Sequence, residues 1–245
     1  VNEFQEITSI YDIEDEAKKP RAFRLAGKVG CYGLPKTILR SQDMTVSVMR
    51  IELTKSIPNH GIRNGDGNEI YFVHDGQGVI YTDFGTLDYK RGDYIFLPKG
   101  TTYAIFPLSS SFFVISEIPK PVFMPRHLWL SDFFPYDPSA IIPAFPRFYT
   151  HSQERHKTFE TFLKTNGNYR TKIIHPFSPF NCVGWQGKLY PFKLSLEHIH
   201  TLASSTFHLP PIALVTFTTE DMNAMISTFK PRWVHSLPYN HMNDH

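Results

Sequence analysis

The stretch that decides the fold is NEIYFVHDGQGVIYTDFGTLDYKRGDYIFLPKGTTYAIF, residues 68–106. Short apolar runs alternate there with turn signals at intervals of about ten residues, a pattern typical of an antiparallel all-β sandwich or barrel. The expected strands are the runs at 69–73, 79–82, 86–89, 94–97 and 103–106, and the pattern continues at 112–115. Asp75-Gly76 is expected to make a hairpin turn between the first two runs, because glycine accepts the positive φ that such a turn requires.

The regions outside this meander carry weaker signals. Phe159, Phe162 and Leu163 are spaced i, i+3 and i+4, which favours a short helix near residues 154–165 that ends at Asn166-Gly167. Composition favours strands and turns in general, since the chain has 21 Phe, 12 Tyr, 19 Pro and 14 Gly. We therefore expect an all-β protein with at most one short helix in that segment.

Charge and hydropathy exclude several classes of protein. The 245 residues carry a formal net charge of +2 with no basic stripe, which argues against nucleic-acid binding. No apolar run approaches the roughly 18 residues that cross a bilayer. The start, Val1-Asn2-Glu3-Phe4, has no secretory pattern, and the two cysteines, Cys31 and Cys182, match no zinc spacing. We expect a cytoplasmic protein without a membrane or nucleic-acid partner.

Twelve histidines make a metal site the first question. A ferrous ion that must bind both substrate and dioxygen favours two His and one carboxylate on one face. The run from Gly92 to Gly100 resembles the second motif of cupin barrels, in which a His usually follows Pro-x-Gly, but Tyr103 stands nearby instead. In the first motif only Glu69 could bind a metal. The barrel is therefore expected to be metal-free.

The remaining histidines allow more than one interpretation. His198-Ile199-His200 is the only His-x-His, and on a strand both rings would face one side. It fits a ligand pair, but a surface strand explains it as well. His74 is expected to be a solvated loop residue. His208, flanked by apolar residues, and His241, near the last residue, would by themselves be a structural His and a His in a frayed tail.

Three blocks of sequence resemble the homogentisate dioxygenase family. The first runs from Asn64-Gly65-Asp66-Gly67 to Thr82-Asp83-Phe84-Gly85. The second is Ser178-Pro179-Phe180-Asn181-Cys182-Val183-Gly184-Trp185-Gln186-Gly187, continued by Tyr190-Pro191-Phe192-Lys193. The third is Pro231-Arg232-Trp233 followed by Pro238-Tyr239-Asn240-His241. The blocks stand in the family's order, so the resemblance is specific.

The resemblance implies a role for three residues. His241 falls on the family's first iron-binding His, His208 on the active-site His that transfers a proton at a substrate hydroxyl, and Tyr239 on the pocket wall. The family's carboxylate ligand is a Glu six residues after that first His, which here would lie beyond His245. The chain is therefore expected to be truncated within the iron site. Asn240 and Met242 depart from the family pattern.

The resemblance also implies an architecture and a reaction. Residues 1–197 are expected to form a cupin-like β-sandwich or jelly-roll domain without metal, and residues 198–245 the beginning of a second, iron-binding cupin barrel. The expected activity is an Fe(II)-dependent, extradiol-type cleavage of homogentisate by dioxygen to maleylacetoacetate, in tyrosine and phenylalanine catabolism, by a homo-oligomer (trimer or hexamer). Two alternatives stay open: a dioxygenase for another hydroxylated aromatic acid, and a metal-free cupin binding protein.

Overall fold

In a computed structural model, most of the described residues lie in strands. The described residues are 4–8, 21–25, 33–53, 60–124, 138–146, 158–180, 187, 189–200, 203–204, 207–208 and 215–230. Over these ranges the regular structure consists of β-strands and two short 3-10 turns, η2 (Pro138–Ala140) and η4 (Leu196–His198). Within them no helix is long and apolar enough to span a membrane. The predicted all-β class is confirmed.

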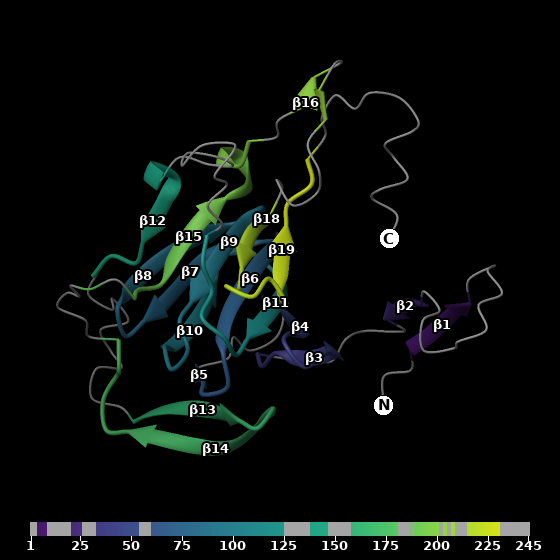
Figure 1. Cartoon of the computed structure of the whole chain (residues 1–245). Coiled ribbons are helices and arrows are strands. Elements are labelled where there is room, and N and C mark those ends of the chain that lie inside the picture. Colours follow the sequence, from purple (N-terminus) through teal and green to yellow (C-terminus); the bar gives the residue numbers. More distant parts are fainter. Residues whose placement is uncertain are drawn as a thin grey trace.

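Two large sheets form the body of the molecule (Figure 1). The seven-stranded sheet runs, in spatial order, β12 (Ile141–Pro143), β15 (Phe192–Ser195), β9 (Asp93–Leu97), β6 (Asn68–Asp75), β11 (Ser111–Ile118), β4 (Thr45–Ile51) and β3 (Lys36–Arg40). The six-stranded sheet runs β14 (Asn168–His175), β13 (Phe159–Thr165), β5 (Gly61–Asn64), β10 (Thr102–Pro107), β7 (Gln77–Thr82) and β8 (Gly85–Lys90). Three separate pairs complete the described strands: β1 (Phe4–Thr8) with β2 (Arg21–Leu25), β16 (Ala203–Ser204) with β17 (Phe207–His208), and β18 (Val215–Thr218) with β19 (Met225–Ser227).

The predicted strands are present, but one predicted turn is wrong. Gly76 has the positive φ that the sequence suggested, +96°. The chain nevertheless does not fold back there, because β6 pairs with β9 and β11 whereas β7 pairs with β8 and β10 in the other sheet. The chain crosses repeatedly from one sheet to the other between β4 and β11. This is the predicted cupin-like jelly-roll sandwich rather than a simple meander of hairpins.

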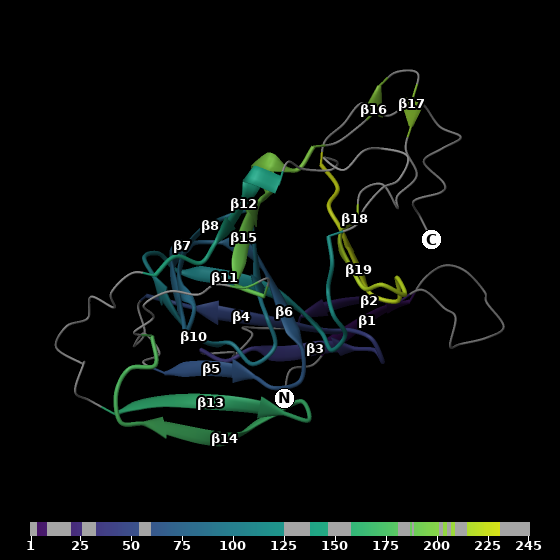
Figure 2. The same cartoon turned by 60° about the vertical axis from the view of Figure 1, so that its left-hand side comes forward.

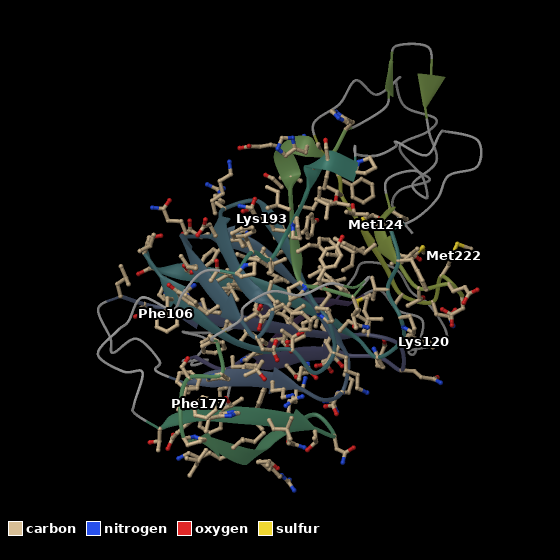
Figure 3. All side chains as sticks on the ribbon, turned by 90° about the vertical axis from the view of Figure 1, so that its left-hand side faces the viewer. Phe106, Lys120, Met124, Phe177, Lys193 and Met222 are labelled. Carbon is tan, nitrogen blue, oxygen red and sulfur yellow. The ribbon has the colours of Figure 1, made fainter. Side chains whose placement is uncertain are left out.

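The main core lies between the two sheets. Inward-facing apolar residues alternate along each strand with residues of the opposite face, as the two-residue period of a strand requires. Figure 3 shows side chains filling this space. The buried residues of this core are Met49, Ile51, Ile62, Tyr71, Val73, Ile80, Leu87, Tyr89, Ile95, Leu97, Tyr103, Ile105, Phe113 and Ile115.

The helix predicted near residues 154–165 is contradicted by the structure over residues 159–165, and residues 154–157 lie outside the described residues. Residues 159–165 form strand β13, which pairs antiparallel with β14 and parallel with β5. Phe159 and Thr161, two residues apart, are buried on the same side. The i, i+3, i+4 spacing of three apolar residues is compatible with a strand as well, and long-range pairing with β5 decides between the two. Asn166-Gly167 is the turn of the β13–β14 hairpin, which lies along β5 in Figures 1 and 2.

The outer face of the seven-stranded sheet is covered by a second apolar cluster. Ile70, Tyr94 and Phe96 contribute to it from β6 and β9, and Phe192 stacks on Phe96 with 5.0 Å between ring centroids. Phe217 of β18 packs edge-on against Tyr94 at 5.7 Å. The β18–β19 hairpin therefore packs against this sheet. The domain boundary at residue 197 stays a prediction.

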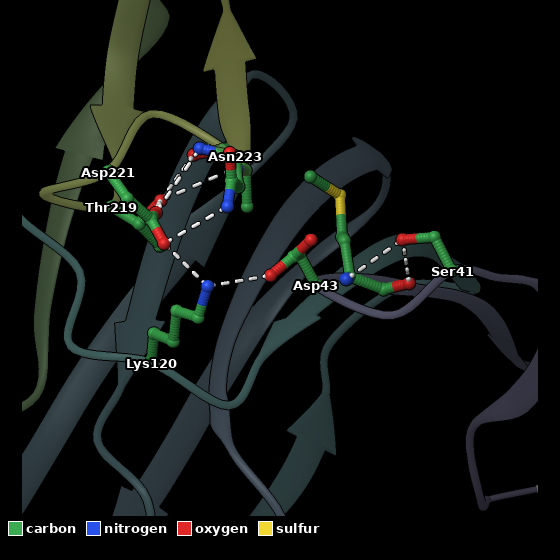
Figure 4. Close-up of polar contacts among 8 residues, drawn as sticks. Ser41, Asp43, Lys120, Thr219, Asp221 and Asn223 are labelled. Atoms are coloured by element: carbon green, nitrogen blue, oxygen red, sulfur yellow. Dashed lines mark hydrogen bonds and ion pairs between the residues drawn. The ribbon is translucent and has the colours of Figure 1, made fainter.

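A lysine holds the β18–β19 hairpin at its turn (Figure 4). Lys120 Nζ donates to Asp43 Oδ1 at 2.8 Å and to Asp221 Oδ2 at 2.5 Å, so it joins the β3–β4 loop to the hairpin turn. The hydrogen bonds from Lys120 and Thr219 lower the pKa of Asp221 to about 2. A shallow depression of about 280 Å³ lies beside Lys120, Phe123 and Asp221. Lys120, Met124 and Met222 lie on this side of the molecule (Figure 3).

We expect Lys120→Met to loosen the hairpin without unfolding the sandwich. Exchange of the backbone N–H groups of Thr218 and Ala224 should become several-fold faster, because an exposed ion pair contributes locally and weakly. Hydrogen-exchange mass spectrometry measures this. Lys90→Met, which breaks the exposed Lys90–Glu197 pair elsewhere, is the matched control and should leave the hairpin unchanged. Equal exchange rates in wild type and Lys120→Met would show that Lys120 does not hold the β18–β19 hairpin in place.

Candidate functional site

Of the three predicted site residues, His208 alone lies in the part of the chain that the structure describes. His208 ends β17, where its backbone pairs with Ala203 of β16. Tyr239 and His241 lie outside the described residues. The roles of all three therefore remain predictions.

The exposed histidines differ from the sequence interpretation in their elements but not in their exposure. His198 ends the 3-10 turn η4 and His200 follows it, so the expected strand is wrong. The Ser195 hydroxyl accepts a hydrogen bond from the Glu197 backbone N–H at 3.4 Å, which favours a turn over a strand there. Both rings are exposed, as is His74, which lies in strand β6 rather than in a loop. The surface interpretation fits all three.

A set of polar side chains lies in the interior between the sheets, where apolar residues are the rule. Glu69 continues the inward-facing row of Tyr71 on β6, and Glu117 continues that of Ile115 on β11. Asn64, Tyr103 and Lys164 come from three neighbouring strands of the opposite sheet. We call this set the interior polar cluster; its members are Asn64, Glu69, Tyr71, Tyr103, Glu117, Lys164 and Tyr169.

The two glutamates of the cluster lie side by side on neighbouring strands of the seven-stranded sheet. Glu69 and Glu117 are directly opposite in the register of β6 and β11, and their exposed fractions are 2% and 5%. Two ionised carboxylates at such a position would repel each other strongly in a medium of low polarity. The arrangement requires a proton, a cation or hydrogen-bond donors to balance the charge. The structure supplies all three.

Two tyrosines form a chain of hydrogen bonds that ends at Glu69. The Tyr103 hydroxyl donates to Glu69 Oε2 at 2.9 Å. The hydroxyls of Tyr71 and Tyr103 lie 2.5 Å apart, so Tyr71 donates to Tyr103. Burial raises the pKa of both tyrosines well above the usual value, and the nearby Glu69 raises it further. Both hydroxyls therefore keep their protons and act as donors.

Burial also changes the acidity of Glu69. Loss of hydration raises the pKa of Glu69 from 4.5 to about 7, and the charge of Glu117 adds to this increase. Hydrogen bonds from Asn64 and Tyr103 and the charge of Lys164 oppose it. Around neutral pH, Glu69 therefore exists in both its protonated and its ionised form.

Lys164 balances the second glutamate. Its Nζ donates to Glu117 Oε2 at 2.5 Å, and the two side chains are 3% and 7% exposed. Asn64 Nδ2 donates to the same carboxylate oxygen. A buried ion pair is stable only when its geometry is good and further hydrogen bonds compensate the lost hydration. Asn64 provides such a bond here.

The β13–β14 hairpin owes its position to Asp66. The two carboxylate oxygens of Asp66 accept from the backbone N–H groups of Asn166 at 2.8 Å and Gly167 at 2.7 Å. Gly65 N–H donates to the Lys164 carbonyl at 2.9 Å. These bonds fix the hairpin turn on the loop that follows β5. The side chain of Lys164 is thereby held in the interior.

The interior polar cluster does not have the donor set of an iron site. Among the described residues, no group of three or more His, Cys, Asp or Glu could hold a metal ion. The two carboxylates present are engaged by Tyr103, Asn64 and Lys164, and a lysine ammonium stands where a cation would bind. Fe(II) in dioxygenases prefers two imidazoles and one carboxylate. No step involving iron is assigned to this barrel.

Most of this cluster was missed from sequence. Glu69 and Tyr103 stand at cupin-motif positions, whereas Glu117 and Lys164 do not. The available signal was a charge at the inward phase of an apolar strand, since Glu117 follows Phe113 and Ile115 at two-residue steps. Lys164 carried no such signal, because the buried residues that precede it on β13, Phe159 and Thr161, stand on the other phase of the strand.

Comparison with known proteins shows that this chain is similar to dioxygenases. Residues 36–196 match the family model described as homogentisate 1,2-dioxygenase N-terminal. A protein of Saccharolobus solfataricus named as a dioxygenase is 31% identical over 175 residues, 69% of this chain and 43% of the relative. Homogentisate 1,2-dioxygenase of Dictyostelium discoideum is 26% identical over 205 residues, 78% of this chain and 46% of the relative. The chain spans less than half the length of these relatives.

Solved structures give weaker likenesses. A cupin 2 conserved barrel domain protein from Leptotrichia buccalis matches 35% of this chain and 40% of its own, with 17% identity and a TM-score of 0.31. The EutQ protein of Clostridium difficile matches 35% of this chain and 67% of its own, with 20% identity and a TM-score of 0.30. Likenesses with such low TM-scores bear on neither the fold nor the function.

The proton on Glu69 makes stability depend on pH in a defined direction. Its pKa is about 7 in the folded protein and 4.5 ordinarily, so the folded state binds one more proton between these pH values. Stability should therefore fall by about 3 kcal/mol as pH rises from about 4.5 to above 7. Glu69→Gln, which resembles the protonated form, should remove this loss. Urea unfolding of both proteins across that range measures it, and parallel pH curves would show that Glu69 does not carry the proton.

Proposed function

Because the chain belongs to the homogentisate 1,2-dioxygenase family, we propose that it acts in an Fe(II)-dependent, extradiol-type dioxygenase that converts homogentisate to maleylacetoacetate. The observation that carries the proposal is the family match across residues 36–196, which includes both large sheets. Two relatives named homogentisate 1,2-dioxygenase, from Dictyostelium discoideum and Oryza sativa, align over 78% and 77% of the chain. The reaction would belong to tyrosine and phenylalanine catabolism.

In this proposal the sandwich is a scaffold, and the chemistry takes place elsewhere. The interior polar cluster has no free ligands for iron. The cavity between the sheets that Met49, His60 and Ile105 line holds about 10 Å³, space for a water but not for an aromatic acid. We therefore assign the iron to His241 as one ligand, and the wall of the substrate pocket to Tyr239. Iron bound there would supply open coordination positions for substrate and dioxygen.

His208 has a separate role in this proposal. It exchanges a proton with the ring hydroxyl para to the one that binds the metal, a task suited to imidazole because its ordinary pKa lies near neutrality. Such a group raises the rate through proton transfer, not through binding of the metal. In the structure His208 is the last residue of the two-residue strand β17.

Two alternatives make different predictions. A relative acting on another hydroxylated aromatic acid would bind iron and consume dioxygen with a different substrate. A metal-free binding protein would do neither, and the ligand-poor interior of the sandwich is the observation in its favour. The proposed substrates are a small aromatic acid and dioxygen. The proposed assembly is a cytoplasmic homo-oligomer of this chain.

Iron content and oxygen uptake of the full-length protein separate these functions. We expect about one iron per chain and rapid oxygen consumption with homogentisate, and His241→Ala should lose both, because imidazole is one of few ligands. Oxygen consumption with a different hydroxylated acid would support the first alternative. A protein with an intact fold, no iron and no uptake would support the second.

The His208 assignment needs its own test. His208→Ala should retain the fold and the iron but lower turnover at least about a hundredfold, the effect typical of losing a positioned acid–base group. Steady-state oxygen uptake together with iron analysis measures both quantities. His74→Ala removes an exposed histidine of the scaffold and should leave turnover unchanged. Turnover near that of wild type in His208→Ala would reject the role.

A further inference from the structure

Three members of the interior polar cluster carry groups that can react with one another as well as form hydrogen bonds. Lys164 and Asn64 are directly opposite each other in the parallel pairing of β13 and β5. Both side chains point to Glu117 on the facing sheet, and each residue is only 2% exposed. An amine, a carboxamide and a carboxylate are thus held together where solvent does not enter.

The carboxylate of Glu117 holds the amine and the amide at the same oxygen. Lys164 Nζ donates to Glu117 Oε2 at 2.5 Å, and Asn64 Nδ2 donates to that atom as well. Two hydrogen bonds to one oxygen keep the two nitrogens within roughly 6 Å of each other. Proximity of this kind, fixed by two strands, replaces a bimolecular encounter by an intramolecular one.

The carbonyl of Asn64 is prepared for attack by a nucleophile. Its Oδ1 accepts from the backbone N–H of Asp66 at 2.8 Å and from that of Gly67 at 3.2 Å. Two backbone donors on one carbonyl oxygen stabilise the negative charge that develops there when an amine adds to the carbon. Both donors are backbone N–H groups of the turn between β5 and β6, so the fold itself supplies them.

The usual competing nucleophile is restrained. Asn64 precedes Gly65, and in such pairs the glycine nitrogen can attack the asparagine side chain. Here Gly65 N–H donates to the Lys164 carbonyl at 2.9 Å, which holds it in the strand pairing. The Lys164 amine is then the nucleophile best placed for Asn64.

We propose that Lys164 and Asn64 become joined by an intramolecular isopeptide bond, with Glu117 as the proton carrier. Glu117 takes a proton from the Lys164 ammonium, and the freed Nζ lone pair adds to Asn64 Cγ. The Cγ–Nδ2 bond breaks, and Glu117 returns the proton while Nζ loses its second one, so that the nitrogen of Asn64 leaves as ammonium. One amide bond forms, one breaks, and nothing is oxidised or reduced.

The surroundings protect such a bond. Tyr71 and Tyr103 of the cluster are fully buried, Lys164 Nζ lies 5.9 Å from the ring centroid of Tyr169, and the buried hydroxyl of Tyr169 has no hydrogen-bond partner within the described structure. Water is excluded, which favours the amide over its hydrolysis. The bond would close a loop from residue 64 to residue 164 and fasten the β13–β14 hairpin covalently to β5. Constraint of the unfolded chain by such a loop stabilises the fold.

The intact mass of the purified, folded protein tests the proposal. The wild type should weigh about 17 Da less than its sequence, the mass of one ammonia. A cyclic imide at an Asn-Gly pair loses the same mass, so the protein is also digested and its peptides are sequenced. The isopeptide requires one branched peptide that contains both Asn64 and Lys164. A wild-type protein of full sequence mass, or a lighter protein whose Asn64 and Lys164 peptides are separate, overturns the proposal.

Variants assign the roles. Lys164→Arg and Asn64→Ala should each restore the full mass, since each lacks one reacting group. Glu117→Gln should slow the appearance of the lighter species at least about tenfold, because the Gln amide can hydrogen-bond but cannot take a proton from Lys164 and return it. Lys172→Met, on the same hairpin in an exposed ion pair with Glu160, is the matched control and should remain lighter by the same amount. An unchanged rate in Glu117→Gln would remove Glu117 from the mechanism.

Discussion

The opposition of Glu69 and Glu117 on neighbouring strands is the constraint on which the interior of this protein depends. A jelly-roll sandwich ordinarily fills the space between its sheets with apolar side chains. Here two carboxylates occupy directly opposed positions, and neither can be ionised without compensation in a medium of low polarity. The protein resolves this by asymmetry. Glu69 has a raised pKa and accepts a hydrogen bond from the Tyr71–Tyr103 chain. Glu117 is paired with the Lys164 ammonium and accepts a hydrogen bond from the Asn64 amide.

That asymmetry explains why the β13–β14 hairpin is built as it is. Lys164 can reach Glu117 only if the hairpin lies along β5, and parallel pairing with β5 places it there. The Asp66 carboxylate then fixes the hairpin turn through two backbone N–H groups. Loop, hairpin and buried charge are thus parts of one arrangement. Weakening any one of them leaves a charge without its partner, which is more costly than losing an ordinary surface contact.

The sequence predicts the strands of this fold well and their partners poorly. The strands at 68–75, 77–82, 85–90, 93–97 and 102–107 follow from local alternation and turn residues. Gly76 shows the limit of this reasoning, because its positive φ is a local property whereas the sheet that the chain enters next is not. Phe159, Phe162 and Leu163 show the same limit, since only pairing with β5 makes that segment a strand. The interior polar cluster could be predicted in part, from Glu69 and Tyr103. Lys164 could not, because it stands on the opposite phase of β13 from the buried Phe159 and Thr161 and is placed by the long-range pairing with β5.

The interior polar cluster also separates two tasks that cupin barrels can combine. A barrel that binds a metal balances the charge of its carboxylate with the ion and needs open coordination positions beside it. Here the Lys164 ammonium, before the proposed isopeptide bond forms, and hydroxyl protons balance the charge, and they leave no open coordination position, so the sandwich gains stability in place of metal chemistry. A family whose chemistry is proposed to lie outside this sandwich can accept that exchange, because a rigid support improves the placement of residues on the elements attached to it. The seven-stranded sheet illustrates this, since its outer face already packs against the β18–β19 hairpin through Tyr94 and Phe217.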